Sequence, residues 1–285
     1  GGQLGRELLR ALAPLGELIA LDRHMPGGDL SQPEAVAAAV RRLRPTVIVN
    51  AAAYTAVDKA ETESELAHAI NALAPGVLAD EANRLGVWLV HYSTDYVFDG
   101  SGDTPWRENA PTAPLSVYGR SKLAGEEAIR AAGCRHLILR TSWVYAVRGG
   151  NFARTMLRLA AERERLTVIA DQHGAPTGAE LIADVSAHAL RAEHADRSLG
   201  GTYHLAAGGE TSWHGYASFV IEQARKLGAT LKAGEIAPIG TRDYPTAAAR
   251  PLNSRLDTSR LRERFGLALP DWRDGVARML REILD

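Results

Sequence analysis

Apolar and polar positions along the chain follow two alternating patterns. Short unbroken apolar runs, typical of strands buried on both faces, alternate with longer segments in which apolar residues recur every three or four positions. The strand-like runs lie at 18–21, 46–50, 87–93 and 136–142. This alternation predicts an α/β fold, a doubly wound (Rossmann) parallel sheet with helices on both faces.

The helical patterns separate these runs. They lie at 4–13, 33–44, about 63–85 and from 116 onward. Residues four apart lie on one face of a helix. We therefore expect Tyr118 and Lys122, in the sequence VYGRSK, to project from the same side of the last of these helices.

After Tyr145 the pattern loosens and predicts a smaller C-terminal α/β domain. We expect a dinucleotide-binding domain over 1–148 and a mainly substrate-binding domain over 149–285. The elements predicted in the second part are helices at 151–164, 180–192, 213–228 and 272–284, a strand at 166–170, a strand at 202–206 that returns to the main sheet, and a proline-rich loop over a site at 236–251.

Composition narrows the class of protein. The 285 residues carry 33 Lys and Arg against 34 Asp and Glu, a formal charge of -1, so no basic field favours a nucleic-acid partner. A single cysteine, Cys134, excludes an internal disulfide and a cysteine-based metal cluster and suits a reducing compartment. The sequence shows neither an apolar run of about 18 residues nor a basic-then-apolar leader. We therefore expect a soluble cytoplasmic protein with no membrane partner.

The chain opens with GGQLGRELLRAL, in which Gly2 and Gly5 match the second half of a G-x-x-G-x-x-G turn. Glycine there lets a pyrophosphate approach the free N–H groups of a helix N-terminus. Such a turn follows a strand, so we expect the first strand and first glycine of the fold to be missing from the sequence given. A plain turn before a helix is the alternative interpretation.

The acidic residues that follow favour a dinucleotide. Asp22 ends the run at 18–21 and suits the two hydroxyls of an adenosine ribose, unless it is only a turn residue. Arg23 suits a 2′-phosphate instead, so the pair leaves NADH versus NADPH open. Asp29 is expected either to contact the adenine edge or to cap the helix at 33–44. The three alanines at 51–53 suit either a ligand lying against the backbone or tight helix packing.

The run ending in HYSTDYVFDG brings Thr94 and Asp95 to the carboxyl edge of the sheet, where open α/β sheets bind ligands. With Tyr118 and Lys122 they predict hydride transfer to a carbonyl. Tyrosine, whose ordinary pKa is about 10, becomes a useful proton donor beside the Lys122 ammonium and an oxidised nicotinamide. Thr94 supplies a second hydrogen bond to the developing oxyanion. The alternative for the Tyr–Lys pair alone is a solvated helix surface.

At these residues the chain resembles the extended short-chain dehydrogenase/reductase superfamily and, within it, the dTDP-4-dehydrorhamnose reductases. The resemblance covers essentially the whole chain in order, except for the first strand. The matching segments are 2–5, 50–61, 91–100, 104–126, 139–145, 150–157, 171–184 and 250–261.

The resemblance implies NADPH-dependent reduction of the 4-keto group of dTDP-4-dehydro-L-rhamnose, with NADH as the alternative cofactor. This is the last step toward the rhamnose donor of cell-surface polysaccharides. Thr94, Tyr118 and Lys122 are the implied catalytic residues. The cofactor is implied to contact Gly2, Gln3, Leu4, Gly5, Asp22, Arg23, Asp29, Leu30, Ala53, Tyr54, Thr55, Tyr92, Tyr118 and Lys122.

Four further residues are candidates for the nucleotide-sugar substrate. Asp95 and Trp143 are implied by the resemblance, although Trp143 also suits an ordinary core position. We add Arg250 and Asn253 as candidates for the diphosphate, because a guanidinium matches phosphate in charge and geometry. A surface ion pair is the alternative for Arg250.

Some members of this family form homodimers with Mg²⁺ held between subunits by glutamates. Glu7, Glu180 and Glu282 stand at the matching positions. Glutamate is also common on solvated helix surfaces, so these residues alone do not establish a metal site.

Three other functions fit parts of the pattern. A sugar-nucleotide dehydratase needs a second carboxylate beside the threonine, but Tyr96 follows Asp95 here. A C4 epimerase is opposed only by the closer family resemblance. A non-catalytic, nucleotide-binding regulatory subunit of the same fold has no need for the Tyr–Lys pair, so an enzyme is favoured.

Overall fold

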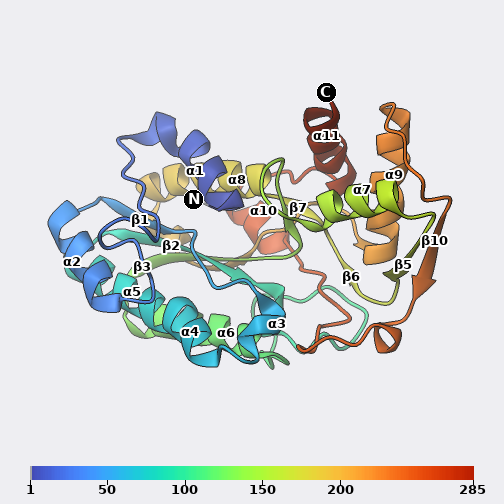
Figure 1. Ribbon diagram of the computed structural model, residues 1–285. Helices are drawn as coiled ribbons and strands as arrows, with labels where there is room; N and C mark the ends of the chain where they lie inside the picture. The colour runs from blue at the N-terminus through green and yellow to red at the C-terminus, as the bar shows by residue number, and fades with distance from the viewer. Residues whose placement is uncertain (1) are drawn as a thin grey trace.

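The computed structural model describes residues 2–285, without the side chains of 193–195 and 197. A four-stranded parallel sheet forms the larger part (Figure 1). Its order is β1 (Val47–Asn50), β2 (Trp88–Thr94), β3 (Arg135–Thr141) and β8 (Gly201–His204). The predicted α/β class with a parallel sheet is therefore confirmed, and the strand near 202–206 does pair with β3.

Helices cover both faces of this sheet (Figure 1). One face packs against α2 (Pro33–Leu43), α5 (Ala74–Leu85) and α6 (Val117–Ala131), and the other against α1 (Gln3–Leu12), α8 (Ala179–Ala195) and α10 (Ser259–Phe265). Successive strand residues face opposite sides. Leu89 and Ile138 enter the first core, whereas Val90 and Leu139 enter the second.

The second part of the chain forms a smaller lobe beside the sheet (Figure 1). Its core contains buried side chains of three helices, among them Tyr216, Trp272 and Val276. The lobe's elements are β4 (Val144–Tyr145), α7 (Phe152–Glu162), β5 (Arg165–Ile169), β6 (His173–Gly174), β7 (Thr177–Gly178), β9 (Thr211–Ser212), α9 (Trp213–Lys226), β10 (Glu235–Ile239) and α11 (Trp272–Leu284). No helix within residues 2–285 is long and apolar enough to cross a membrane.

The prediction of a strand at 18–21 is wrong. These residues form an extended loop after α1, with Leu18, Ile19 and Leu21 exposed. A strand exists only where a neighbour completes its hydrogen bonds, and β1 ends the described sheet without pairing to this segment. The stretch 236–251 also differs, because β10 occupies its beginning and pairs with β5. The strand expected before Gly2 lies outside the described residues.

The helical pattern at 63–85 becomes three joined segments. They are α4 (Ser64–His68), a π-helical turn at Ala69–Leu73 and α5, preceded by the short α3 (Val57–Ala60). The π turn buries Asn71, whose amide donates to Ser121 Oγ on α6. π turns inside helices often occur at functional sites.

A buried ion pair fastens α6 to β3. The Arg140 guanidinium donates two hydrogen bonds to Glu126, at 2.8 and 2.6 Å, and both side chains are almost fully buried. Burial alone would raise the pKa of Glu126, but the hydrogen bonds and charge of Arg140 outweigh it and hold the pKa below its ordinary value. The carboxylate is therefore a stabilising partner at neutral pH.

Replacing this carboxylate should destabilise the protein. We expect Glu126→Gln to lower the free energy of unfolding by about 3 kcal/mol, because Arg140 keeps a buried charge without its counter-ion. A carboxylate whose pKa in the folded protein lies below its ordinary value stabilises the protein fully at pH values above the ordinary pKa. This stabilisation is lost as the pH falls through the pKa of the folded state. Urea midpoints from pH 7 to 3.5 should therefore converge for parent and variant.

Glu162→Gln is the matched control, because Glu162 forms an exposed pair with Arg158 on α7. Its free energy of unfolding, from the same urea titration, should stay within about 0.5 kcal/mol of the parent value. Equal effects of the two substitutions would show that the buried pair has no special role.

Candidate active site

The carboxyl end of β2 and the start of α6 meet at one edge of the sheet. β2 ends at Thr94, and Asp95 begins a short 3-10 turn. Ser116 caps α6, its hydroxyl accepting a hydrogen bond from the Gly119 N–H at 3.1 Å. This cap fixes where the helix begins and therefore where Tyr118 lies.

Gly119 allows the close approach of α6 to the β2 end. A Cβ at this position would overlap the carbonyl oxygen of Tyr96 and lie 3.0 Å from Pro114. The ring of Tyr96 packs edge-on against Tyr118, with centroids 5.7 Å apart. The absence of a side chain at Gly119 thus brings the Tyr118 ring against the segment that carries Thr94 and Asp95.

Thr94 and Asp95 form one hydrogen-bonded unit. The Thr94 hydroxyl donates to Asp95 Oδ1 at 3.1 Å and accepts from the Tyr96 N–H at 3.2 Å. Burial raises the pKa of Asp95 to about 7, against hydrogen bonds from Ser254 and Thr94. Asp95 Oδ2 is buried without a partner in the described structure. This oxygen is a free polar atom in the site, as a substrate hydroxyl requires.

The pKa values of Tyr118 and Lys122 are both shifted by burial. Burial raises the pKa of Tyr118 to about 12, with the Thr94 hydroxyl opposing the shift and the Asp95 charge adding to it. Burial lowers the pKa of Lys122 to about 8, while the charge of Glu126 opposes that shift. The Lys122 ammonium donates to the carbonyl oxygen of Tyr92 at 2.6 Å. The residues predicted as a catalytic trio therefore lie at the junction of β2 and α6, with Thr94 and Lys122 buried and Tyr118 partly exposed.

Asn71, which the sequence analysis did not select, joins the loop after β1 to α6. Its side chain accepts from the Tyr54 N–H at 2.8 Å and donates to Tyr54 O and to Ser121 Oγ, each at 3.0 Å. A buried amide that uses both ends in this way fixes two segments relative to each other. An asparagine inside an alanine-rich helical run was the available signal.

The first turn of α1 suits an anion. Gly2 precedes the helix without a side-chain cap, and an added Cβ at Gly2 or Gly5 would meet nothing within 4 Å. The first N–H groups of a helix have no intrahelical partner. Gln3 reaches across to the second lobe, donating to Gly150 O and accepting from Asn151. A pyrophosphate fits this position by charge and by space.

Asp22 and Arg23 lie on the exposed loop after α1, not at a strand end. Asp22 accepts the His24 N–H at 2.9 Å, a turn contact that leaves Oδ2 available. Asp29 accepts from the N–H and hydroxyl of Ser31, which favours its role in the turn before α2. Leu30 packs at the edge of the core beneath α2.

The remaining cofactor candidates lie in the loop after β1 and on β2. Ala53, Tyr54 and Thr55 follow β1 in the loop that Asn71 fixes. A hydrogen bond to Glu63 raises the pKa of Tyr54 to about 12. The Tyr92 hydroxyl donates to Ser186 at 2.7 Å, so its ring faces α8 and only its backbone meets Lys122.

Trp143 has the left-handed backbone conformation, with φ 48°. Its ring stacks on Trp213 with centroids 3.6 Å apart, and Gly174 lies against the same indole. The Trp213 N–H donates to Gln172 at 3.0 Å. One face of Trp143 is therefore occupied by protein, and a ligand has access only to what remains.

Arg250 and Asn253 differ in what they offer a ligand. Arg250 donates to Asp58 on α3 at 2.6 Å, joining the loop of the second lobe to the first. Asn253 is buried, and its amide donates to Ser101 O and Thr104 O and accepts from Arg255. Diphosphate binding by Asn253 requires these three bonds to be exchanged, whereas Arg250 has two to exchange, the pair with Asp58 and a longer bond to Ala248 O at 3.3 Å.

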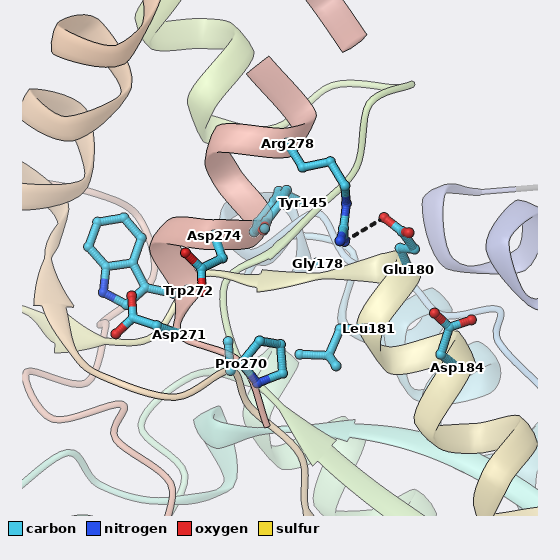
Figure 2. A pocket seen from close by; sticks show the side chains of 12 residues that line it. Tyr145, Gly178, Glu180, Leu181, Asp184, Pro270, Asp271, Trp272, Asp274 and Arg278 are labelled. Carbon is cyan, nitrogen blue, oxygen red and sulfur yellow. Dashed lines mark hydrogen bonds and ion pairs between the residues drawn. The ribbon is translucent and has the colours of Figure 1, made fainter. Parts of the chain in front are cut away.

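The three glutamates suggested for Mg²⁺ do not meet in one copy of the chain. Glu7 pairs with Arg10, Glu180 with Arg278, and Glu282 is exposed on α11. Figure 2 shows Glu180 and Arg278 on the wall of a hollow between α8 and α11. Among the described residues, no group of three His, Cys, Asp or Glu side chains is arranged to hold a metal.

Comparison with known proteins identifies the family. Residues 1–284 match the model described as RmlD substrate binding domain. The chain belongs to this family. A curated dTDP-4-dehydrorhamnose reductase of Shigella flexneri is 57% identical over 284 residues, which cover 99% of this chain and 95% of the relative.

Solved structures agree in fold. A dTDP-4-dehydrorhamnose reductase from Clostridium acetobutylicum is 32% identical, with a TM-score of 0.90 and coverage of 100% of this chain and 97% of that one. Another from Bacillus anthracis, solved in complex with NADP, is 35% identical with a TM-score of 0.88, covering 99% and 96%. The Rossmann-type architecture predicted from the sequence is confirmed.

The close approach at Gly119 is open to a direct test. We expect Gly119→Ala to lower the free energy of unfolding by about 2 kcal/mol, because the new methyl group meets a backbone carbonyl that has no room to shift. Urea denaturation would measure this. Gly234→Ala is the control, since a Cβ there meets nothing; a similar loss in both would contradict the argument.

Proposed function

We propose that this chain catalyses the NADPH-dependent reduction of the 4-keto group of dTDP-4-dehydro-β-L-rhamnose to dTDP-L-rhamnose, the last step of dTDP-rhamnose synthesis. The observation that carries the proposal is a complete Thr94, Tyr118 and Lys122 set, with Thr94 and Lys122 buried and Tyr118 partly exposed, in a chain 57% identical to a curated dTDP-4-dehydrorhamnose reductase. A nucleotide-binding subunit without turnover needs none of these three groups.

In this proposal each residue of the trio has one role. The bound reduced nicotinamide supplies a hydride to the carbonyl carbon. Tyr118 donates its hydroxyl proton to the carbonyl oxygen, so that the ketone becomes an alcohol. Thr94 turns its single hydroxyl hydrogen from Asp95 Oδ1 to the same oxygen as the charge there grows. The positive charge of Lys122 stabilises the Tyr118 phenolate left behind, and its ammonium holds the nicotinamide ribose.

The cofactor is assigned to the first lobe. We place its pyrophosphate at Gly2, Gln3, Leu4 and Gly5, where the first turn of α1 offers free N–H groups. Asp22 then suits the ribose hydroxyls of NADH and Arg23 the 2′-phosphate of NADPH. The NADP complex of the Bacillus anthracis relative supports NADPH, with NADH as the alternative.

The substrate is assigned to the junction of the lobes. Asp95 presents its free oxygen to a sugar hydroxyl, and Trp143 with Trp213 presents an aromatic edge. Arg250 suits the diphosphate once it leaves Asp58. We accordingly divide the chain into 1–148 for the dinucleotide and 149–285 mainly for the substrate, while β8, α8 and α10 pack with the first part.

Loss of the phenolic proton should abolish most of the proposed activity. We expect Tyr118→Phe to reduce kcat at least about 100-fold, because general acid catalysis contributes this much or more. The measurement is the loss of NADPH absorbance with dTDP-4-dehydro-β-L-rhamnose.

Glu162→Gln is the control, since Glu162 is exposed in a pair with Arg158 on α7; it should turn over like the parent. Cofactor binding, measured by NADPH fluorescence, should persist in both variants. A parent that binds NADPH but reduces nothing would overturn the assignment and favour a regulatory subunit or another nucleotide sugar.

We also propose a cytoplasmic homodimer with Mg²⁺ between Glu7, Glu180 and Glu282 of two copies. Carboxylate oxygens are the ligands Mg²⁺ takes, and these three do not assemble within one copy. Sedimentation should show a dimer with MgCl₂ and more monomer with EDTA or in Glu282→Gln. Glu222→Gln, on α9, should behave like the parent. A dimer insensitive to EDTA would refute the metal's role.

A further inference from the structure

Three buried polar side chains form a line beneath the proposed site. Asn50 Nδ2 lies 3.1 Å from His91 Nδ1, and His91 Nε2 lies 3.1 Å from Lys122 Nζ. Their exposures are 5%, 1% and 1%. Asn50 and His91 are register partners on β1 and β2, so the sheet itself places them side by side. A histidine inside the apolar run VWLVHYS is otherwise unexplained.

The protonation state of His91 is linked to its two hydrogen-bond neighbours. Burial, with the charge of Lys122, holds the pKa of His91 well below its ordinary value, so the ring is neutral. A neutral imidazole has one N–H and one acceptor nitrogen. The Lys122 ammonium needs Nε2 as acceptor, which places the hydrogen on Nδ1 facing Asn50.

Asn50 can serve either state of the ring. With its NH₂ toward Nδ1, the amide oxygen accepts the Ala52 N–H at 3.3 Å and Nε2 carries the hydrogen, which suits a neutral amine at Lys122. A half-turn of the amide brings its oxygen to Nδ1 and suits an ammonium. Amide oxygen and nitrogen are similar in size, so the exchange fits the same space, but it turns the NH₂ toward the Ala52 N–H and gives up that 3.3 Å hydrogen bond.

The charged state gains more from this arrangement. A hydrogen bond made by an ionised group is about twice as strong as a neutral one. Besides Tyr92 O on β2, which accepts from Lys122 Nζ, His91 Nε2 contacts that nitrogen in the described structure, and it accepts from the ammonium once Nδ1 carries the ring hydrogen. Replacing it with an apolar side chain therefore removes more from the ammonium than from the amine.

The other charged groups near Lys122 are accounted for. Tyr118 lies one turn before it on α6 and Glu126 one turn after. Glu126 forms ion pairs with Arg140 on β3 and with Arg130, and its charge still raises the pKa of Lys122. Asp95, which follows β2, acts on Tyr118.

We propose that His91, oriented by Asn50, is a positioning residue that keeps Lys122 charged and thereby sets the acidity of the Tyr118 hydroxyl. The link to Tyr118 rests on the function proposed above. The charge of Lys122 does not, and it can be measured without turnover.

The sequence contains only four lysines, Lys59, Lys122, Lys226 and Lys232, so Lys122 can be titrated individually. Carbon-13 label at lysine Cε, followed by NMR from pH 6 to 11, gives its pKa, and Lys122→Arg assigns the resonance. We expect His91→Leu to lower this pKa by about one unit or more. His91→Gln, which keeps a neutral acceptor, should restore most of it.

The pH profile provides the enzymatic readout. The basic limb of kcat/KM should move to lower pH in His91→Leu by about the same amount and return in His91→Gln. Unchanged lysine pKa values in a folded His91→Leu protein, judged by its melting temperature and NADPH binding, would overturn the proposal. A moved pKa in a protein without turnover would instead retain it and refute only the proposed function.

A measurement on the parent covers the case in which His91→Leu does not fold. Nitrogen-15 shifts of the His91 ring at pH 6, where Lys122 is charged, should show hydrogen on Nδ1 and an unprotonated Nε2. A ring protonated on Nε2 at that pH would show that it does not accept from the ammonium, and the proposal would fail.

Discussion

The site depends on placing one ammonium group inside the protein. Lys122 is 1% exposed between β2 and α6, where burial of a charge is costly unless hydrogen bonds replace water. The carbonyl of Tyr92 and the ring of His91 provide these partners, and both belong to β2. The position of α6 over β2 therefore decides whether a charged lysine and the tyrosine one turn away can exist there together.

That position follows from small residues and buried polar contacts on α6. Gly119 and Gly125 lie against the carbonyl oxygens of Tyr96 and Asn71, so the helix sits closer than any side chain would permit. The Glu126 pair with Arg140 fixes the same helix to β3. The π turn places the Asn71 amide where it bonds both to Tyr54, in the loop after β1, and to Ser121 on α6. Catalytic placement and fold stability share these contacts.

The sequence predicts the features that are local and fails on those that need a neighbour. The runs at 46–50, 87–93 and 136–142 became strands because both faces of each are covered by helices. The run at 18–21 has the same composition but no paired strand, and it lies exposed. Tyr118 and Lys122 are found by their spacing of four. Trp213 and His91 are not, since their importance comes from a partner on another element.

The same distinction bears on how the two lobes meet a substrate. Arg250 and Gln3 each join the lobes, one through Asp58 and the other through Gly150 and Asn151. Each lies where an anionic group is expected, the diphosphate of the sugar donor or the pyrophosphate of the cofactor. A phosphate that binds Arg250 competes with the Asp58 carboxylate for the same guanidinium. If the diphosphate binds Arg250 as proposed, ligand binding and the contact between lobes are coupled through one side chain, and affinity for the sugar nucleotide includes the cost of separating this pair.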